Sequence, residues 1–404
     1  MIKRLLFLLM VGIVPVSSFS QVDISGTLDL EVSKGGNDSR WTTNEIAYQY
    51  RNLHLAVNQL NFFVSAQVSD AFFVDTRIQF DTWGTGTLND PRVSLAQLSY
   101  EPTDLSIRLS IGRYVSPFGL FPQRILAADN SFNHMPLGYA YFINISDVFG
   151  FWPGAGEGGI YGGEGDPGLT TIYFGGYNTG LLFNWVVVPE VFSLDLAVTN
   201  AALASQRNYT NLENIAGIVR LGFQPAIFWQ QGISLSHGSF MQQQDTIYSY
   251  YDDFTEFTQT VIGTDLVLGY AYFEVSGEFI YSMWSVPFFD GTDFIRDYYD
   301  KARAISLANY AAYVDLRYEP PFISGSYIAV RYDILKFLES DDLKNIDGMI
   351  YNPWDNDVTR YQIAVGYKFA EPVLLKLSYM DQKTENLDTD PKDQVYRAIL
   401  TVSF

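Results

Sequence analysis

The chain contains no cysteine, and only 3 of its 404 residues are histidine. Without cysteine it has no disulfides and no thiolate ligands, so an extensive hydrogen-bonded network must supply its stability. His54, His134 and His237 do not stand in a Ser/His/Asp or HExxH context. We therefore expect no enzymatic activity, no cofactor and no metal site. The alternative is a lipase whose catalytic triad is brought together only by the folded structure and is not visible as a sequence motif.

Basic residues are also scarce, with 25 Lys and Arg against 45 Asp and Glu, a net charge of −20. No basic stretch is present, and a strongly negative chain is not expected to bind nucleic acid. Residues 251–253, 339–342 and 388–393 are acidic runs with carboxylates of the kind that calcium prefers. None has the spacing of an EF-hand loop, so we expect them to be solvated or bridged to lipopolysaccharide by divalent ions.

Long apolar runs are limited to one segment near the N-terminus. Lys3 and Arg4 precede an apolar run over residues 5–16, and Ser17 and Ser18 follow it. This pattern predicts a secretory signal peptide over residues 1–20, because the run is too short to span a bilayer as a helix. No linker or shift in composition divides residues 21–404, which we expect to form a single domain.

What the chain does contain is aromatic residues, at 16%, and a strict alternation of apolar and polar residues. Residues 105–111 alternate Leu, Ile, Leu and Ile with Ser, Arg and Ser, and residues 373–379 behave alike. Such a period of two is typical of strands between two different environments. The apolar faces persist for about ten residues, which favours tilted membrane-spanning strands over the shorter strands of a β-sandwich.

The segment 395–404 shows the same pattern and ends the given sequence in mid-strand. One face carries Phe404, Val402, Leu400, Ala398 and Tyr396; the other carries Ser403, Thr401 and Arg397, with Ile399 as an exception. A free apolar edge of this kind promotes aggregation, so we expect it to pair with the first strand and close a barrel. Arg397 then lies beside Asp29 and Glu31. We also expect residues 396–404 to be the signal that the barrel assembly machinery recognises.

Short connections set the predicted number of strands. Five contain proline, at Pro102, Pro189, Pro225, Pro320 and Pro372, and two more lie at 69–71 and 270–271. Seven short turns with both ends of the barrel in the periplasm predict an all-β antiparallel barrel of sixteen strands. The expected ranges are 23–33, 57–68, 72–83, 91–101, 104–114, 172–188, 190–200, 212–223, 226–237, 258–270, 272–285, 304–318, 322–334, 357–369, 372–383 and 394–404. Eighteen strands are the alternative, because glycines at 175 and 176 interrupt the range 172–188.

A sixteen-stranded barrel is wide enough to leave an aqueous channel, and the alternation predicts which charges line it. The inward basic residues are Arg77, Arg108, Arg220, Arg317, Arg331, Lys368, Lys376 and Arg397. The inward acidic residues are Asp29, Glu31, Asp75, Asp81, Asp195, Asp265, Glu274, Glu278, Asp315 and Asp333. On the last strands Arg331, Lys368, Lys376 and Arg397 form a basic arc, and Asp265, Glu274 and Glu278 form an acidic arc. Opposed arcs would create a transverse field; the alternative is that many of these charges pair across neighbouring strands. The acidic surplus predicts a weak preference for cations.

The longest connection, residues 115–169, is the third outer loop and is far longer than ordinary connections. It is rich in Phe, Tyr and Pro, which is unusual for a loose surface loop. We expect it to fold into the lumen and form the pore constriction with Phe118, Phe121, Arg124 and Asp129. The alternative is an outward cap over the barrel mouth.

The nine residues Gly112-Arg113-Tyr114-Val115-Ser116-Pro117-Phe118-Gly119-Leu120 carry a resemblance. This strand end, which runs into a long third loop, resembles the corresponding segment of the phosphate-selective porin O and P family and related Gram-negative general porins. The resemblance implies a trimeric passive diffusion channel in the outer membrane. That family selects anions with lysines in the constriction, whereas residues 115–169 contain one basic residue, Arg124, against five acidic ones: Asp129, Asp147, Glu157, Glu164 and Asp166.

The sequence therefore predicts an outer-membrane porin for small polar solutes or ions, with outer-membrane lipid and lipopolysaccharide as its surroundings. The alternative is a structural or accessory barrel subunit of an outer-membrane complex, with its lumen plugged by residues 115–169. Single-channel conductance separates the two functions.

Overall fold

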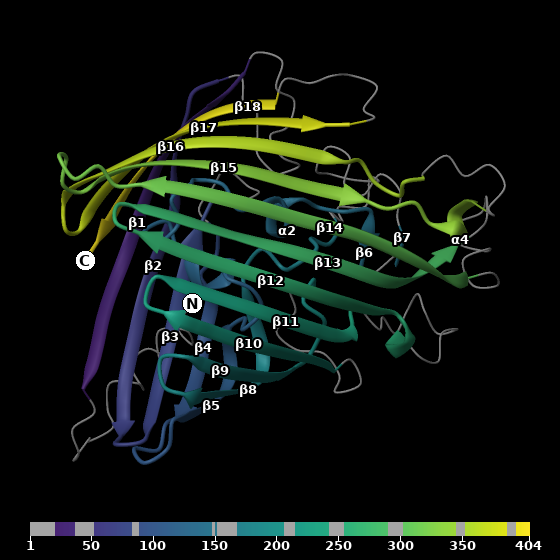
Figure 1. The fold of residues 1–404 in the computed structure, drawn as a ribbon, viewed down its shortest axis with the longest axis horizontal. Helices are drawn as coiled ribbons and strands as arrows, with labels where there is room; N and C mark the ends of the chain where they lie inside the picture. The colour runs from purple at the N-terminus through teal and green to yellow at the C-terminus, as the bar shows by residue number, and fades with distance from the viewer. Residues whose placement is uncertain are drawn as a thin grey trace, which may run out of the picture.

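The computed structural model describes residues 21–36, 52–82, 89–147, 150–151, 168–205, 215–241, 254–289, 302–344, 352–385 and 393–404. They form a closed antiparallel barrel of sixteen strands, as the alternation predicted (Figure 1). The barrel strands are β1 (Val22–Gly35), β2 (His54–Ser69), β3 (Phe72–Asp81), β4 (Arg92–Tyr100), β5 (Ile107–Val115), β8 (Tyr177–Val188), β9 (Phe192–Thr199), β10 (Ala216–Ala226), β11 (Trp229–Ser239), β12 (Thr258–Tyr270), β13 (Phe273–Phe289), β14 (Ala302–Tyr318), β15 (Ser326–Phe337), β16 (Val358–Ala370), β17 (Val373–Thr384) and β18 (Asp393–Ser403).

The remaining elements are short. They are η1 (Phe121–Arg124), α2 (Leu137–Ala140), β6 (Ile145–Ser146), β7 (Gly150–Phe151), η2 (Phe254–Glu256) and α4 (Asp341–Lys344). Among the described residues no helix is long and apolar enough to cross a bilayer. The predicted signal peptide, the acidic run 251–253 and most of the run 388–393 lie outside the described residues.

Three details of the predicted topology are wrong. The range 172–188 is a strand only from Tyr177 onward, because residues 168–176 belong to the returning end of the long loop. The eighteen-stranded alternative is therefore wrong as well: β6 and β7 form a two-stranded sheet of their own, outside the barrel wall. Pro225 lies inside the irregular end of β10, and the turn follows it at residues 227–228.

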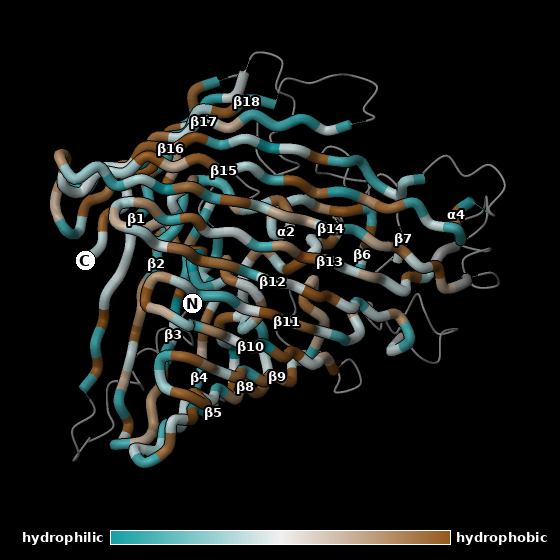
Figure 2. The backbone as a smooth tube through the Cα atoms, in the orientation of Figure 1, coloured by the Kyte–Doolittle hydropathy of each residue, from teal (hydrophilic) through white to brown (hydrophobic). Residues whose placement is uncertain are grey.

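The two faces of the wall differ as the alternation predicted. Along β17 the side chains of Leu374, Lys376 and Ser378 are buried, whereas Leu377 between them is 52% exposed. Figure 2 shows the same alternation of hydrophobic and hydrophilic positions along β12 to β17. A wall that buries polar residues and exposes large apolar ones is built for lipid outside and water or polypeptide inside. The short-turn end of such a barrel faces the periplasm, and the long connections face outward.

The barrel closes between β1 and β18, as expected. Leu30 pairs with Leu400, and residues 27–35 pair with residues 395–403. Beyond the last pair, the Gly26 N–H donates to the Phe404 carbonyl at 2.8 Å, and the Phe404 N–H donates to the Gly26 carbonyl at 2.9 Å. Arg397 Nε lies 3.2 Å from a carboxylate oxygen of Glu31, so the predicted contact across the seam with this acid is present.

Gly26→Val is expected to weaken this closing seam. A Cβ at residue 26 would lie 2.8 Å from the Asn61 carbonyl oxygen and against the Phe404 ring, which lies over this glycine. Such overpacking costs about 1–3 kcal/mol. Gly217→Val is the matched control, because a Cβ there meets nothing within 4 Å. Urea unfolding in detergent, followed by tryptophan fluorescence, should show a lower midpoint for the first variant; equal midpoints would contradict the prediction.

Candidate functional site

The long loop between β5 and β8, called the inner loop here and described over residues 116–147, 150–151 and 168–176, folds into the barrel. Phe118, Leu137, Ile143 and Ile145 are each 0% exposed. They belong to one core with inward-facing apolar residues of the wall, including Ile280, Trp284, Val286, Leu307 and Leu335. Figure 1 shows α2, β6 and β7 within the outline of the barrel. The prediction of an inward loop is therefore confirmed, and the outward cap is wrong.

The loop enters the lumen through a close fit at Gly119. This residue has φ +70°, and its N–H donates to the Ser234 Oγ at 3.2 Å. A Cβ here would overlap the Glu278 carboxylate, which also accepts a 2.8 Å hydrogen bond from the Tyr139 hydroxyl. Burial and the neighbouring Glu278 carboxylate hold the pKa of Tyr139 well above its ordinary value, so this hydroxyl remains a donor. Glu278 was predicted to line the lumen. Its side chain does lie on the inner face of the wall, but the inner loop covers it.

The four residues predicted for the constriction separate into two pairs. Phe118 and Phe121 are loop residues whose side chains are buried in the core between the loop and the wall, so they hold the loop in place. Arg124 Nη1 donates to Glu274 Oε1 at 2.7 Å and to Ser276 Oγ at 3.4 Å. Asp129 has an exposed side chain on the loop. Partial desolvation by the surrounding chain raises the pKa of its carboxyl, and the positive charges of Lys376 and Arg124 oppose that rise. Their role in a constriction stays a prediction.

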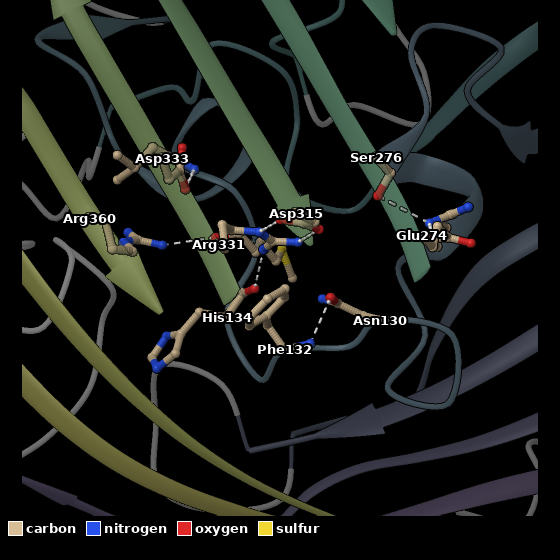
Figure 3. A network of polar contacts seen from close by, with 12 residues as sticks. Asn130, Phe132, His134, Glu274, Ser276, Asp315, Arg331, Asp333 and Arg360 are labelled. Carbon is tan, nitrogen blue, oxygen red and sulfur yellow. Dashed lines mark hydrogen bonds and ion pairs between the residues drawn. The ribbon is translucent and has the colours of Figure 1, made fainter. Parts of the chain in front are cut away.

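Four wall cations bind backbone carbonyls of the inner loop between residues 127 and 135. Lys376 Nζ donates to the carbonyl oxygens of Ala127 at 2.6 Å and Asn130 at 3.0 Å, and more distantly to that of Phe132. The next three carbonyls accept from three guanidinium groups: Asn133 from Arg397 at 3.1 Å, His134 from Arg331 at 3.0 Å, and Met135 from Arg360 at 2.9 Å. We call residues 127–135 the carbonyl strap. Figure 3 shows Arg331 and Arg360 beside it.

The predicted basic arc thus exists in part. Lys376, Arg331 and Arg397 come together on the carbonyl strap, whereas Lys368 is exposed towards the periplasmic end of β16. The sequence prediction missed Arg360, although it shares the inward face of β16 with Gln362 and Ala364, so the alternation itself contained the signal. These cations stabilise the loop, because charge-assisted hydrogen bonds to buried carbonyls satisfy both partners.

Several other predicted wall charges form ion pairs with one another or with nearby carboxylates. Arg220 and Asp265 form a two-pronged ion pair, with Nη2 to Oδ1 at 2.8 Å. Arg331 and Asp315 do likewise, at 2.6 and 2.7 Å. Arg108 lies 2.9 Å from Glu101 and 3.3 Å from Asp75. Arg331 and Asp315 lie on the neighbouring strands β15 and β14, as the pairing alternative predicted, whereas β11 separates Arg220 on β10 from Asp265 on β12. Asp333 accepts the Leu137 N–H at 2.8 Å, and Arg317 stacks on the Tyr327 ring.

Open space remains on the side of the lumen that the inner loop does not fill. A cavity of about 340 Å³ lies between the returning end of the loop and the inner faces of β2 to β5 and β18. Its charged lining residues are Arg77, Asp81, Arg92, Arg113 and Arg397. A second cavity of about 320 Å³ opens near the periplasmic ends of β8 to β11 and has an acidic lining of Glu190, Asp195 and Asp265 with Arg220.

Arg113 in the first cavity is a second residue that the sequence prediction missed. Strict alternation places it on the outer face with Leu109 and Ile111. Gly112 has φ +120° and no space for a Cβ against the Ala96 carbonyl, so the strand is irregular here and Arg113 turns inward. Its guanidinium lies 5.9 Å from the centre of the Tyr173 ring. The glycine was the only signal in the sequence.

The acidic runs give no ion site in the described part of the chain. No group of three or more His, Cys, Asp or Glu residues there is placed to hold a metal ion. In the run at 339–342, Glu339 and Asp341 both form ion pairs with Lys344 of α4, at 2.8 and 3.1 Å. These carboxylates are therefore already partly neutralised.

Comparison with known proteins gives structural matches. No family model matches the sequence, and no curated protein matches it. The channel DcaP of Acinetobacter baumannii matches with a TM-score of 0.60 at 14% identity, over 96% of this chain and 98% of that one. The anion-selective porin of Comamonas acidovorans matches with a TM-score of 0.58 at 8% identity, over 96% and 100%. This chain has the fold of the outer-membrane porins.

A third match, OmpT of Vibrio cholerae, an outer membrane protein, has a TM-score of 0.56 at 10% identity and covers 96% of this chain and 99% of that one. Identities this low show a shared porin fold and nothing of the solute. The matches span the whole barrel, which agrees with the strand order and the closed seam described above.

Proposed function

We propose that this porin-fold protein is an outer-membrane channel through which small polar solutes or ions diffuse passively. The observation that carries the proposal is the cavity beside β2 to β5, which stays open although the inner loop fills the opposite side of the lumen. Its polar lining suits hydrated solutes, because rings of charged and polar side chains replace part of a solute's water. A wall with an apolar outer face supports an outer-membrane location.

The accessory-subunit alternative is favoured by one observation, the number of bonds that hold the inner loop. Lys376, Arg331, Arg360 and Arg397 all bind the carbonyl strap, and a loop held so firmly suits a permanent plug. Planar-bilayer recording decides between the two. We expect stepwise single-channel currents from the purified full-length protein, and a membrane that stays silent at saturating protein would favour the accessory subunit.

Three finer features of the channel are also proposals. A homotrimer is supported by one matched structure, which is described as a trimer form, and native mass spectrometry tests it. The weak cation preference predicted from the acidic surplus stays a prediction, and the reversal potential in a salt gradient tests it. Kinship with the phosphate-selective porins rests on residues 112–120 alone.

The surroundings of the barrel complete the proposal. A signal peptide over residues 1–20 would direct export, and residues 396–404 would be recognised by the barrel assembly machinery. Outer-membrane lipid would contact the apolar outer face, on which Ile363 and Leu377 are 51% and 52% exposed. Lipopolysaccharide would lie at the outer ends of the strands.

A further inference from the structure

The cavity beside β2 to β5 is basic in a chain that is strongly acidic. Four arginines and one aspartate line it, a surplus of three positive charges, against a net charge of −20 for the whole chain. Glu31 does not line the cavity but forms an ion pair with Arg397; if its charge is included, the surplus is two positive charges. The sign of this one cavity is therefore opposite to that of the protein.

Two of these arginines have only neutral acceptors. Arg77 donates from Nε and Nη2 to Asn61 Oδ1, at 3.0 and 2.8 Å, and from Nη1 to the Tyr177 hydroxyl. Arg113 donates from Nε to the Ser94 carbonyl at 2.9 Å. Neither forms an ion pair with any residue that the structure describes. A buried guanidinium without an anionic partner is costly, so an anion that enters the cavity is stabilised there.

Other arginines of the wall show the contrast. Arg108, Arg220 and Arg331 each have a carboxylate within ion-pair distance. Arg77 is only 5% exposed, so bulk water does not solvate its charge. Asp29 of β1 interacts with Arg77 only from beyond ion-pair distance. The missing anionic partner is thus a property of Arg77 and Arg113 and not of the wall arginines in general.

Aromatic rings of β8 and of the inner loop hold the two guanidinium groups in place. The guanidinium carbons of Arg77 and Arg113 lie 5.9 and 5.7 Å from the centre of the Tyr177 ring, and Arg113 also lies near the Tyr173 ring. Stacking on a ring fixes a guanidinium plane and leaves its edge free to donate. The planar fork matches a carboxylate, while the rings and Phe174 offer surface to a carbon skeleton.

We propose that this cavity is a binding subsite for small organic carboxylates, formed by Arg77 and Arg113 against Tyr177, with Arg92 and Arg397 as further positive charges. The inference rests on the proposed channel function and names its solute class. A volume of about 340 Å³ suits a small organic anion. Because Tyr173 and Phe174 belong to the inner loop, whereas the arginines and Tyr177 belong to the wall, the complete subsite requires the loop in its inward position.

Equilibrium binding tests the subsite without any need for conductance. Calorimetry on the full-length protein in detergent uses succinate, benzoate and inorganic phosphate as separate probes. We expect succinate or benzoate to bind, and Arg77→Gln/Arg113→Gln to weaken binding at least tenfold, about 1.4 kcal/mol. Lys344→Gln, which removes one positive charge from the outer loops, is the control and should bind like the wild type. Arg113→Gln alone, at a half-buried position, keeps the test decisive if the double variant does not fold.

Binding measurements can overturn the subsite. The proposal is overturned if the wild-type protein binds neither carboxylate, whatever its conductance and whether or not it binds phosphate. Carboxylate binding by a protein that carries no current would overturn the channel and leave the subsite standing. In a conducting protein, the permeability ratio of chloride to potassium should fall in Arg77→Gln/Arg113→Gln relative to the wild type, and an unchanged ratio would contradict the proposal.

Discussion

Gly119→Val is expected to unseat the start of the inner loop, lower the stability of the barrel and enlarge the single-channel current. The left-handed backbone at φ +70° costs a β-branched residue about 1–2 kcal/mol. A side chain here also meets the Glu278 carboxylate, and overpacking of this kind adds about 1–3 kcal/mol. Neither the loop nor the wall has space to absorb it, since Phe118 and Tyr139 fill the neighbouring core.

The measurements are a urea midpoint in detergent and the step size in planar bilayers. Gly269→Val is the matched control, because this glycine has ordinary backbone angles and a Cβ there meets nothing within 4 Å. We expect wild-type midpoint and current for the control. Gly119→Val with an unchanged midpoint and unchanged current would show that the inner loop does not depend on this close fit.

Lys376→Met is the second substitution with a large expected effect. The ammonium group is 0% exposed and donates to three carbonyls of the carbonyl strap. Methionine fills part of the space but donates nothing, so those buried carbonyls lose their partner. Removing a buried charged donor costs roughly 2–5 kcal/mol. We expect residues 127–135 to separate from β17, and the channel to fluctuate between current levels.

Lys383→Met provides the comparison, since it makes the same change on the same strand at an exposed position. Hydrogen exchange of amides in the carbonyl strap reports the detachment directly. Faster exchange is expected for Lys376→Met and wild-type exchange for Lys383→Met. If the strap of Lys376→Met stays as protected as in the wild type, Arg331, Arg360 and Arg397 hold it without the lysine.

The wall was predictable because a barrel between lipid and water imposes a period of two on every strand. That period assigned Lys376 inward and Leu377 outward, and the same period along β16 places Arg360 inward with Gln362. Where the backbone departs from regular geometry the argument fails. Gly112 is one such place, and it moved Arg113 to the opposite face from its expected one.

The contents of the lumen were harder to predict. Partners such as the carbonyls of residues 127–135 are backbone atoms that every residue possesses, so no residue type marks them. One signal was available: apolar residues such as Ile280 and Trp284 face inward, and apolar side chains in a lumen require a cover. Ile399 is an apolar exception on the otherwise polar inner face of β18, and it likewise indicates a covered lumen.

The seam between β1 and β18 has a consequence for the order of folding. Most neighbouring strands are joined by turns and can pair as soon as both have been synthesised. By contrast, β1 can pair with β18 only when nearly the whole chain is present, because Leu30 pairs with Leu400. Contacts so distant in sequence form slowly, and until they form both edges carry unpaired backbone groups. Residues 26–35 and 393–404 are therefore the surfaces that a folding helper must shield, and their pairing is expected to be the last committed step of assembly.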